Sequence, residues 1–175
     1  NHDDGDDGQA LQYRYLFGDD SLNYFFDYGA WRFIQVDNSS SVFSPDETLN
    51  WLEGVLEETP EGTHVVVSAH KPIAGVEKWA YHSWDPEPSD RFQQLVRDHD
   101  VKHVFFGHIH AYSTAVHEGV PYTITGGGGA GLHDRYGPQG NVHHYLICDA
   151  SADGELQQQV VRFYEIEEEG TEVSD

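Results

Sequence analysis

Two histidines stand two residues apart in the stretch FFGHIHAYS, directly after an apolar run that ends at Gly107. In an extended segment residues i and i+2 point to the same side, so His108 and His110 are expected to direct their imidazoles at one small volume. Neutral imidazole is a common ligand of first-row metal ions. The spacing therefore indicates a metal site, although the chain has 12 histidines and two polar loop residues would give the same pattern.

Two apolar runs and the segment between them are expected to position these histidines. HVVVSAH, residues 64–70, and VKHVFFG, residues 101–107, are continuous apolar runs typical of strands that are covered on both faces. Between them, residues 89–100 begin with a capping serine and carry an apolar stripe at helical spacing, which predicts a helix. Parallel strands joined through a helix end at the same edge of a sheet, where ligands of open α/β folds bind. His70, the last residue of the first run, is therefore expected beside the His-x-His pair, in a ligand set that suits Mn, Fe or Zn.

The rest of the chain contains further predicted strands and one more helix. Residues 23–29 and 31–37 predict a hairpin, and residues 45–58 predict an amphipathic helix behind a capping serine or aspartate. Four more strands are predicted by the runs AYSTAVH, VPYTITG, HHYLICDA and QQQVVRFYEI. The single Cys148 lies in the third of these runs and is expected to be buried. Together the elements predict an α/β layered fold in which helices cover a mixed sheet.

Composition limits the number of domains and the kinds of partner. A chain of 175 residues suits one domain, expected over residues 1–164, followed by an acidic, flexible tail at residues 165–175. Asp and Glu number 31 against 9 Lys and Arg, so the formal net charge of -22 disfavours a nucleic acid or an anionic membrane as partner. The same excess is typical of proteins kept soluble in concentrated salt, which predicts a soluble protein with an acidic surface from a high-salt, halophilic organism. The compartment is not indicated, because the sequence contains neither an apolar stretch of membrane-spanning length nor a signal peptide.

Three blocks of the chain resemble the motifs of one enzyme family. The blocks are Asn1-His2-Asp3, SAHKP with His70, and GHIH with His108 and His110. In their order and spacing they resemble the calcineurin-like metallophosphoesterases, which include purple acid phosphatases and cyclic-nucleotide phosphodiesterases. FDYGAWRFIQVD is similar to the central hairpin of this family, and TGGGGAG to its glycine-rich turn. The resemblance covers nearly the whole chain and implies a layered sandwich of mixed β-sheets flanked by helices.

The resemblance implies a site for two divalent metal ions, Mn, Fe, Zn or similar. Asn1, His70 and His108 would bind one ion, His110 would bind the other, and His2 would be the general acid. The implied activity is the hydrolysis of a phosphomonoester or phosphodiester by a two-metal-activated hydroxide, without a protein nucleophile. Two cations can offset the charge of the transition state, and an imidazolium can protonate the departing alkoxide. A phosphate ester is therefore the implied partner.

The family's earlier motifs are absent from this sequence. An Asp-x-His and a Gly-Asp, whose aspartate bridges the metals, precede the Asn-His block in the family. We therefore expect the chain to be the carboxyl-terminal part of a longer phosphoesterase, with the missing amino-terminal segment as a partner. The parent would be an enzyme, whereas the chain alone could be a non-catalytic remnant or binding subunit with an incomplete metal site. A structural zinc domain is a third alternative, but closed zinc sites often use thiolates, and the chain has one cysteine.

Two further segments are expected near the site. His133 follows the glycine run and is a candidate contact for the substrate or for a ligand histidine. The loop of residues 71–88 could line a substrate pocket or pack against the body of the protein. Its aromatic residues are Trp79, Tyr81, His82 and Trp84. Neither segment indicates which phosphate ester is bound, so no substrate-binding residue is assigned.

Overall fold

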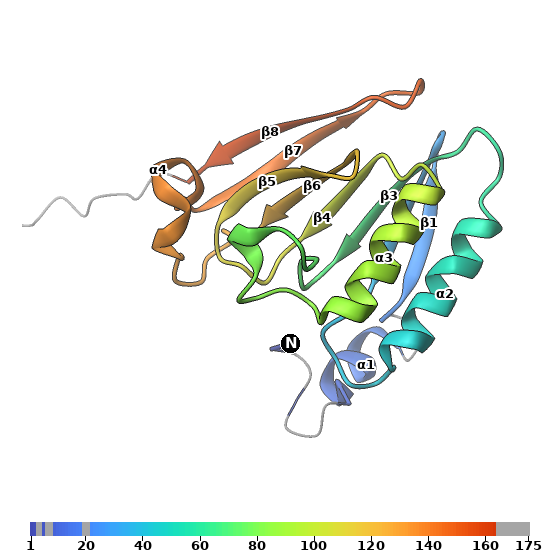
Figure 1. Ribbon diagram of the computed structural model, residues 1–175, viewed down its shortest axis with the longest axis horizontal. Coiled ribbons are helices and arrows are strands. Elements are labelled where there is room, and N and C mark those ends of the chain that lie inside the picture. Colours follow the sequence, from blue (N-terminus) through green and yellow to red (C-terminus); the bar gives the residue numbers. More distant parts are fainter. Residues whose placement is uncertain (3–4, 6–8, 19–21, 164–175) are drawn as a thin grey trace, which may run out of the picture.

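The structure is a computed structural model that describes residues 1–2, 5, 9–18 and 22–163 (Figure 1). In chain order its helices and strands are α1 (Leu11–Phe17), β1 (Tyr24–Tyr28), β2 (Trp31–Val36), α2 (Pro45–Glu57), β3 (His64–Ala69), η2 (Glu77–Trp79), α3 (Pro86–Asp98), β4 (His103–Phe106), β5 (Tyr112–His117), β6 (Val120–Thr125), η3 (Asp134–Tyr136), α4 (Gly137–Gly140), β7 (His144–Ala150) and β8 (Leu156–Arg162). The predicted flexible tail at residues 165–175 lies outside the described residues. No helix within the described ranges is long and apolar enough to cross a lipid bilayer.

A six-stranded mixed sheet forms the centre of the molecule, in the order β1-β2-β3-β4-β6-β5. The inner strands β2, β3, β4 and β6 run parallel, and the antiparallel strands β1 and β5 form the two edges. The separate pair β7 and β8 lies alongside this sheet (Figure 1), with Gln158 of β8 hydrogen-bonded to Thr123 of β6 at 3.1 Å. The predicted α/β layered fold, with helices on a mixed sheet, is confirmed.

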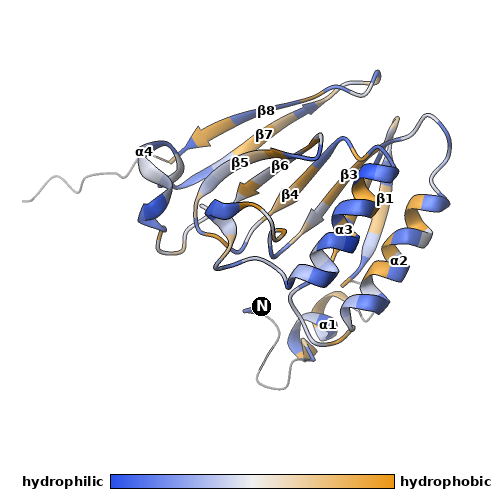
Figure 2. Cartoon of the chain, viewed as in Figure 1, coloured by the Kyte–Doolittle hydropathy of each residue, from blue (hydrophilic) through white to orange (hydrophobic). Residues whose placement is uncertain are grey.

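The helices α2 and α3 cover one face of the central sheet and bury its apolar side chains. The strand register places Ile34, Val67, Val104 and Tyr122 in one row across β2, β3, β4 and β6. Each of these four side chains is at most 2% exposed, and Leu52 of α2 belongs to the same core cluster. Figure 2 shows the result, with hydrophobic strands and hydrophilic outer sides on the two helices. Hydrophobic burial on this face therefore fixes the sheet that carries the site.

The two covering helices begin where capping and proline place them. Ser44 caps α2 in a capping box, and proline takes the first helical position, so the helix predicted at residues 45–58 is confirmed. The helix α3 begins at Pro86, because proline fits the first turn, where its missing N–H needs no partner. The prediction that Ser89 caps this helix is therefore wrong. Ser89 is buried inside the helix, and its hydroxyl accepts a hydrogen bond from the Ala74 amide at 2.6 Å.

Two parts of the structure differ from the sequence-based expectation. The sequence pattern predicts no element for α1, which buries none of its residues, so no core-facing stripe marks it. Cys148 is exposed, and the prediction that it is buried is wrong. Its strand, β7, pairs with β8 alone, and this two-stranded sheet leaves most side chains of β7 uncovered.

Candidate metal centre

His70 and His108 meet at the carboxyl ends of two neighbouring parallel strands. The strands β3 and β4 pair in parallel, and just beyond them Gly107 N donates a hydrogen bond to His70 O at 3.1 Å. The two imidazole rings lie edge to face, with their centroids 4.9 Å apart. The prediction that a strand-helix-strand unit brings these two segments together is confirmed.

A buried amide holds the backbone that carries His70. Asn38 lies just beyond β2 and is 7% exposed. Its Oδ1 accepts hydrogen bonds from the backbone N–H groups of His70 and Lys71, both at 2.9 Å, and its Nδ2 donates to Lys71 O at 2.8 Å. These bonds satisfy backbone groups at the end of β3, so the direction in which His70 leaves the strand is fixed.

The His-x-His segment is a tight turn, and the prediction that it is extended is wrong. Two successive hydrogen bonds between residues i and i+2, at 2.6 and 2.7 Å, close the backbone over residues 107–111. His108 has a φ of 60°, in the left-handed region that non-glycine residues rarely adopt. The turn directs His108 to His70, while His110 Nδ1 hydrogen-bonds Gly131 O at 2.8 Å. Backbone conformations of this kind cluster at functional sites.

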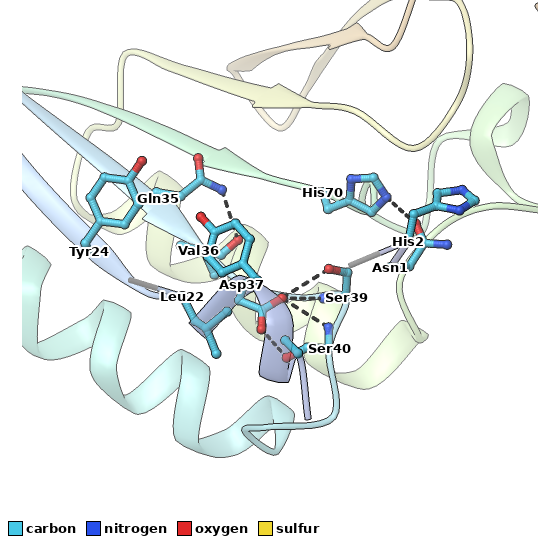
Figure 3. Close-up of a pocket in the computed structure, with 12 residues that line it drawn as sticks. Asn1, His2, Leu22, Tyr24, Gln35, Val36, Asp37, Ser39, Ser40 and His70 are labelled. Carbon is cyan, nitrogen blue, oxygen red and sulfur yellow. Dashed lines mark hydrogen bonds between the residues drawn. The ribbon is translucent and has the colours of Figure 1, made fainter. Parts of the chain in front are cut away.

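Three potential donor atoms converge where these segments meet. Asn1 Oδ1 lies 2.5 Å from His70 Nε2, which lies 3.1 Å from His108 Nδ1. Adjacent ligands of one octahedral first-row ion, at bond lengths of about 2.1 Å, are about 3 Å apart. The 3.1 Å between the two histidine nitrogens fits a shared ion, whereas Asn1 Oδ1 is at direct hydrogen-bond distance from His70 and would move outward by about 0.5 Å to share it. Figure 3 shows Asn1 facing His70, with His2 beside them. Among the described residues no three His, Cys, Asp or Glu side chains form a metal-binding group, so the third donor is the asparagine oxygen.

Burial keeps the two converging histidines uncharged at neutral pH. It lowers the pKa of His70 and the pKa of His108 to about 4, and nearby positive charges, Lys71 among them, add to the effect. Each ring therefore has a free lone pair at neutral pH, which is the form that binds a metal ion.

Two cavities of about 480 Å³ each share Asn1, His2 and His70 as lining residues. The first cavity continues toward β1 and β2 (Figure 3), where the carboxylate of Asp37 accepts hydrogen bonds from its own turn. The second cavity continues along a glycine-rich segment that includes Gly126, Gly128 and Gly129. Its other histidines are His82, His108, His110 and His133.

Comparison with known proteins identifies the family. The family model described as calcineurin-like phosphoesterase matches residues 1–112, a range that includes all three converging donors. The chain belongs to the calcineurin-like phosphoesterase family. No curated protein matches the chain.

Solved structures share the fold of this chain. A purple acid phosphatase from the seeds of yellow lupin, Lupinus luteus, is 18% identical with a TM-score of 0.57, over 80% of this chain and 31% of the lupin chain. GAP50 of Plasmodium, the anchor in the inner membrane complex, is 16% identical with a TM-score of 0.53, over 80% of this chain and 49% of its own. The chain thus spans 31% and 49% of these two proteins, and at such identities the likeness concerns the fold alone.

The remaining predicted site residues, His2 and His110, lie near the three donors. His2 is exposed and lines both cavities next to Asn1. His110 lines the second cavity, with its ring 5.2 Å from the ring of His133. In the described part of the chain, the lining of the second cavity contains no carboxylate.

The aromatic residues of the loop at residues 71–88 divide between the core and the second cavity. Trp79 and Trp84 are buried, and Trp79 Nε1 donates a hydrogen bond to Ser113 Oγ at 3.1 Å. His82 instead lines the cavity, with its ring 5.7 Å from the ring of His108. No local sequence pattern predicts the contact between His82 and His108, because it joins segments that are distant in the chain.

Proposed function

We propose that this chain provides part of the active site of a phosphoesterase that hydrolyses a phosphomonoester or phosphodiester with two divalent metal ions. The convergence of Asn1 Oδ1, His70 Nε2 and His108 Nδ1 carries the proposal. These are donors for a first-row ion, at the edge of a parallel sheet where ligands of α/β folds bind. Membership of the calcineurin-like phosphoesterase family supports the same chemistry.

Each residue at the site would have its own task. Asn1, His70 and His108 would hold one ion, and their neutral state leaves the lone pairs free for this. His110, whose Nδ1 is bonded to the Gly131 carbonyl, would offer Nε2 to the other ion. Divalent ions at such a site offset the charge of the phosphoryl oxygens and lower the pKa of a water nucleophile.

His2 would be the general acid. Its exposed imidazole lies beside Asn1 and lines both cavities, which brings it near an ester bound at the three donors. An imidazolium at this place can give its proton to the departing alkoxide. No protein nucleophile is needed, because water can attack phosphorus directly.

Turnover of an aryl phosphate, with Mn²⁺ or Zn²⁺ supplied, tests the proposal. His70→Ala and His108→Ala are each expected to abolish turnover, because each removes one of the converging donors. His99→Ala is the matched control, since His99 ends α3 next to the amino end of β4, at the opposite edge of the sheet. Unchanged turnover in either site variant would contradict the ligand assignment.

A comparison of esters with good and poor leaving groups distinguishes the role of His2 from that of the metal ligands. His2→Ala should slow the hydrolysis of esters with poor leaving groups far more than that of esters with good ones, because a poor leaving group needs the proton. An equal loss for both kinds of ester would contradict a general-acid role for His2.

One observation favours a second candidate function, in which the chain binds a metal ion but does not hydrolyse an ester by itself. Within the described ranges, no carboxylate lines the second cavity and no three-ligand group surrounds His110. Other residues or a partner would then complete the site of the second ion. No turnover by the wild-type chain, together with one bound ion per chain, would support this candidate over the first.

We also propose that the acidic composition adapts the protein to high salt. With 31 Asp and Glu against 9 Lys and Arg, most carboxylates cannot have a cationic partner. Their mutual repulsion opposes the folded state in dilute buffer, and concentrated salt screens it.

A further inference from the structure

Five histidine rings form a continuous arc along the second cavity. Successive centroids lie 4.9 Å apart for His70 and His108, 5.7 Å for His108 and His82, 5.0 Å for His82 and His133, and 5.2 Å for His133 and His110. The proposed metal centre leaves His82 and His133 without a task. Their ring nitrogens can donate or accept hydrogen bonds, so these two rings can serve as hydrogen-bonding groups for a bound molecule.

The charge of the second cavity differs from that of the rest of the protein. Its described lining contains no Asp or Glu, although the chain has 31 acidic residues among 175. Six of the 12 histidines of the chain line it. An anionic molecule therefore meets no carboxylate in this described lining and is repelled less there than at the acidic surface.

Two loops hold His82 and His133 against each other. His133 N donates a hydrogen bond to His110 O at 3.0 Å, which fixes His133 to the metal-binding turn. Tyr136 OH donates to Lys78 O at 2.8 Å, and this second bond joins the two loops. The ring pair is therefore preorganised, and a molecule that binds to it loses little affinity to the ordering of side chains.

Arg135 follows His133 by two residues, and its positive charge acts on the His133 ring. Among the described residues Arg135 has no ion-pair partner. Its guanidinium stacks over the ring of Tyr81 at 5.3 Å. By contrast, Arg32, Arg91 and Arg97 each pair with an Asp or a Glu. A guanidinium that stacks through its face keeps its N–H groups for the oxygens of an external carboxylate or phosphoryl group.

We infer that His133 and Arg135 form a subsite for a second anionic group, carried on the alcohol part of the phosphate ester. The inference rests on the proposed function, in which the reacting phosphoryl group binds at His70 and His108. The arc of rings leads from those residues to His133, so the alcohol part of the ester extends along it. The substrate class is then a phosphate ester whose alcohol carries a carboxylate or another phosphoryl group.

Binding of phosphonates to the manganese-loaded chain tests this subsite without requiring turnover. Phenylphosphonate supplies one anionic group, and 4-carboxyphenylphosphonate and 1,4-phenylenebisphosphonate supply a second one on the same ring. Calorimetric titration should give about fivefold tighter binding for the ligands with the second group, and the larger of the two gains identifies the preferred group.

Variants locate the gain in affinity. Arg135→Gln and His133→Ala should each remove most of it, because each loses a donor to the second group. Asp134→Asn should increase it, because a negative charge close to His133 is lost. Arg91→Gln is the matched control and should keep the full gain, since Arg91 pairs with Glu53 of α2.

The outcomes separate the subsite from the function on which it rests. A gain that is lost in Arg135→Gln and kept in Arg91→Gln would support the subsite. Equal affinities of the wild-type chain for all three phosphonates would overturn the subsite while leaving the proposed function in place, and so would a gain that persists in both Arg135→Gln and His133→Ala. A manganese-loaded chain that does not bind phenylphosphonate would instead contradict the proposed phosphoryl site and the inference with it.

Discussion

Gly126 is a position where one methyl group would disturb the metal-binding turn directly. A Cβ at Gly126 would lie 2.0 Å from the carbonyl oxygen of Ile109 and 2.8 Å from its carbonyl carbon, although real Cβ contacts are essentially never closer than 3.0 Å. Ile109 is fully buried and stands between His108 and His110. In Gly126→Ala the turn must therefore move by at least about 1 Å, because a close-packed interior has no free space to absorb the methyl group.

Moving the turn in Gly126→Ala lowers the free energy of unfolding by an amount that depends on the atoms in the clash. Overpacking a buried position costs about 1–3 kcal/mol, and a clash with backbone atoms belongs at the upper end, about 3 kcal/mol. For a chain of this size the melting temperature should then fall by about 6–12 °C. Because the displaced turn carries His108 and His110, metal affinity should also fall, at least about tenfold, as it does when a contact that orients a ligand is lost.

Gly128→Ala is the matched control for this prediction. A Cβ at Gly128 meets nothing within 4 Å, and the backbone there is outside the left-handed region, so alanine should leave both properties near their wild-type values. Thermal unfolding followed by circular dichroism and titration with Zn²⁺ measure the two effects on all three proteins. A wild-type melting temperature and zinc affinity in Gly126→Ala would refute the close contact between the glycine segment and the turn.

Three further perturbations test other features of the molecule. Asn38→Leu removes the amide that holds the His70 backbone and should lower zinc affinity at least about tenfold, with a smaller loss in Asn38→Asp, which keeps the acceptor; equal affinities in a zinc titration would contradict this. Burial lowers the pKa of His103 to about 4 from an ordinary value of 6.5, so its neutral form contributes stability that is present above pH 6.5 and is lost as the pH falls toward 4. His103→Gln should therefore reduce the fall in unfolding free energy between neutral pH and about pH 4 by up to about 3 kcal/mol, whereas parallel pH profiles would argue against a buried neutral imidazole. The melting temperature of the wild-type chain should rise from dilute buffer to molar salt as its 31 carboxylates are screened, and a flat or falling trend would refute adaptation to high salt.

Local patterns in the sequence predict the elements that carry the site. Two continuous apolar runs, ending at His70 and at Gly107, identify β3 and β4 because strands buried on both faces need apolar residues throughout. The rule that parallel strands end at one edge then brings their histidines together. The helix α2 is equally predictable, since the Ser44 cap and the apolar stripe act within a few residues of each other.

Features that depend on contacts between distant segments are not predictable in this way. The amide of Asn38 reaches His70 across the ends of two strands, and no local pattern marks that bond. The left-handed φ of His108 runs against the backbone preference of its residue type, so the sequence favours an extended segment instead. The exposure of Cys148 depends on which strands pair with β7, whereas an apolar run shows only that some burial is expected.

The number of metal ions bound per chain tests the central claim most directly. The chain is loaded with manganese or zinc in high-salt buffer, freed of unbound metal and measured by elemental mass spectrometry. At least one ion per wild-type chain is expected, with that ion lost in His70→Ala and in His108→Ala and retained in His99→Ala. A wild-type chain without bound metal, or site variants that bind as much metal as the wild type, would contradict the assignment of these histidines as ligands.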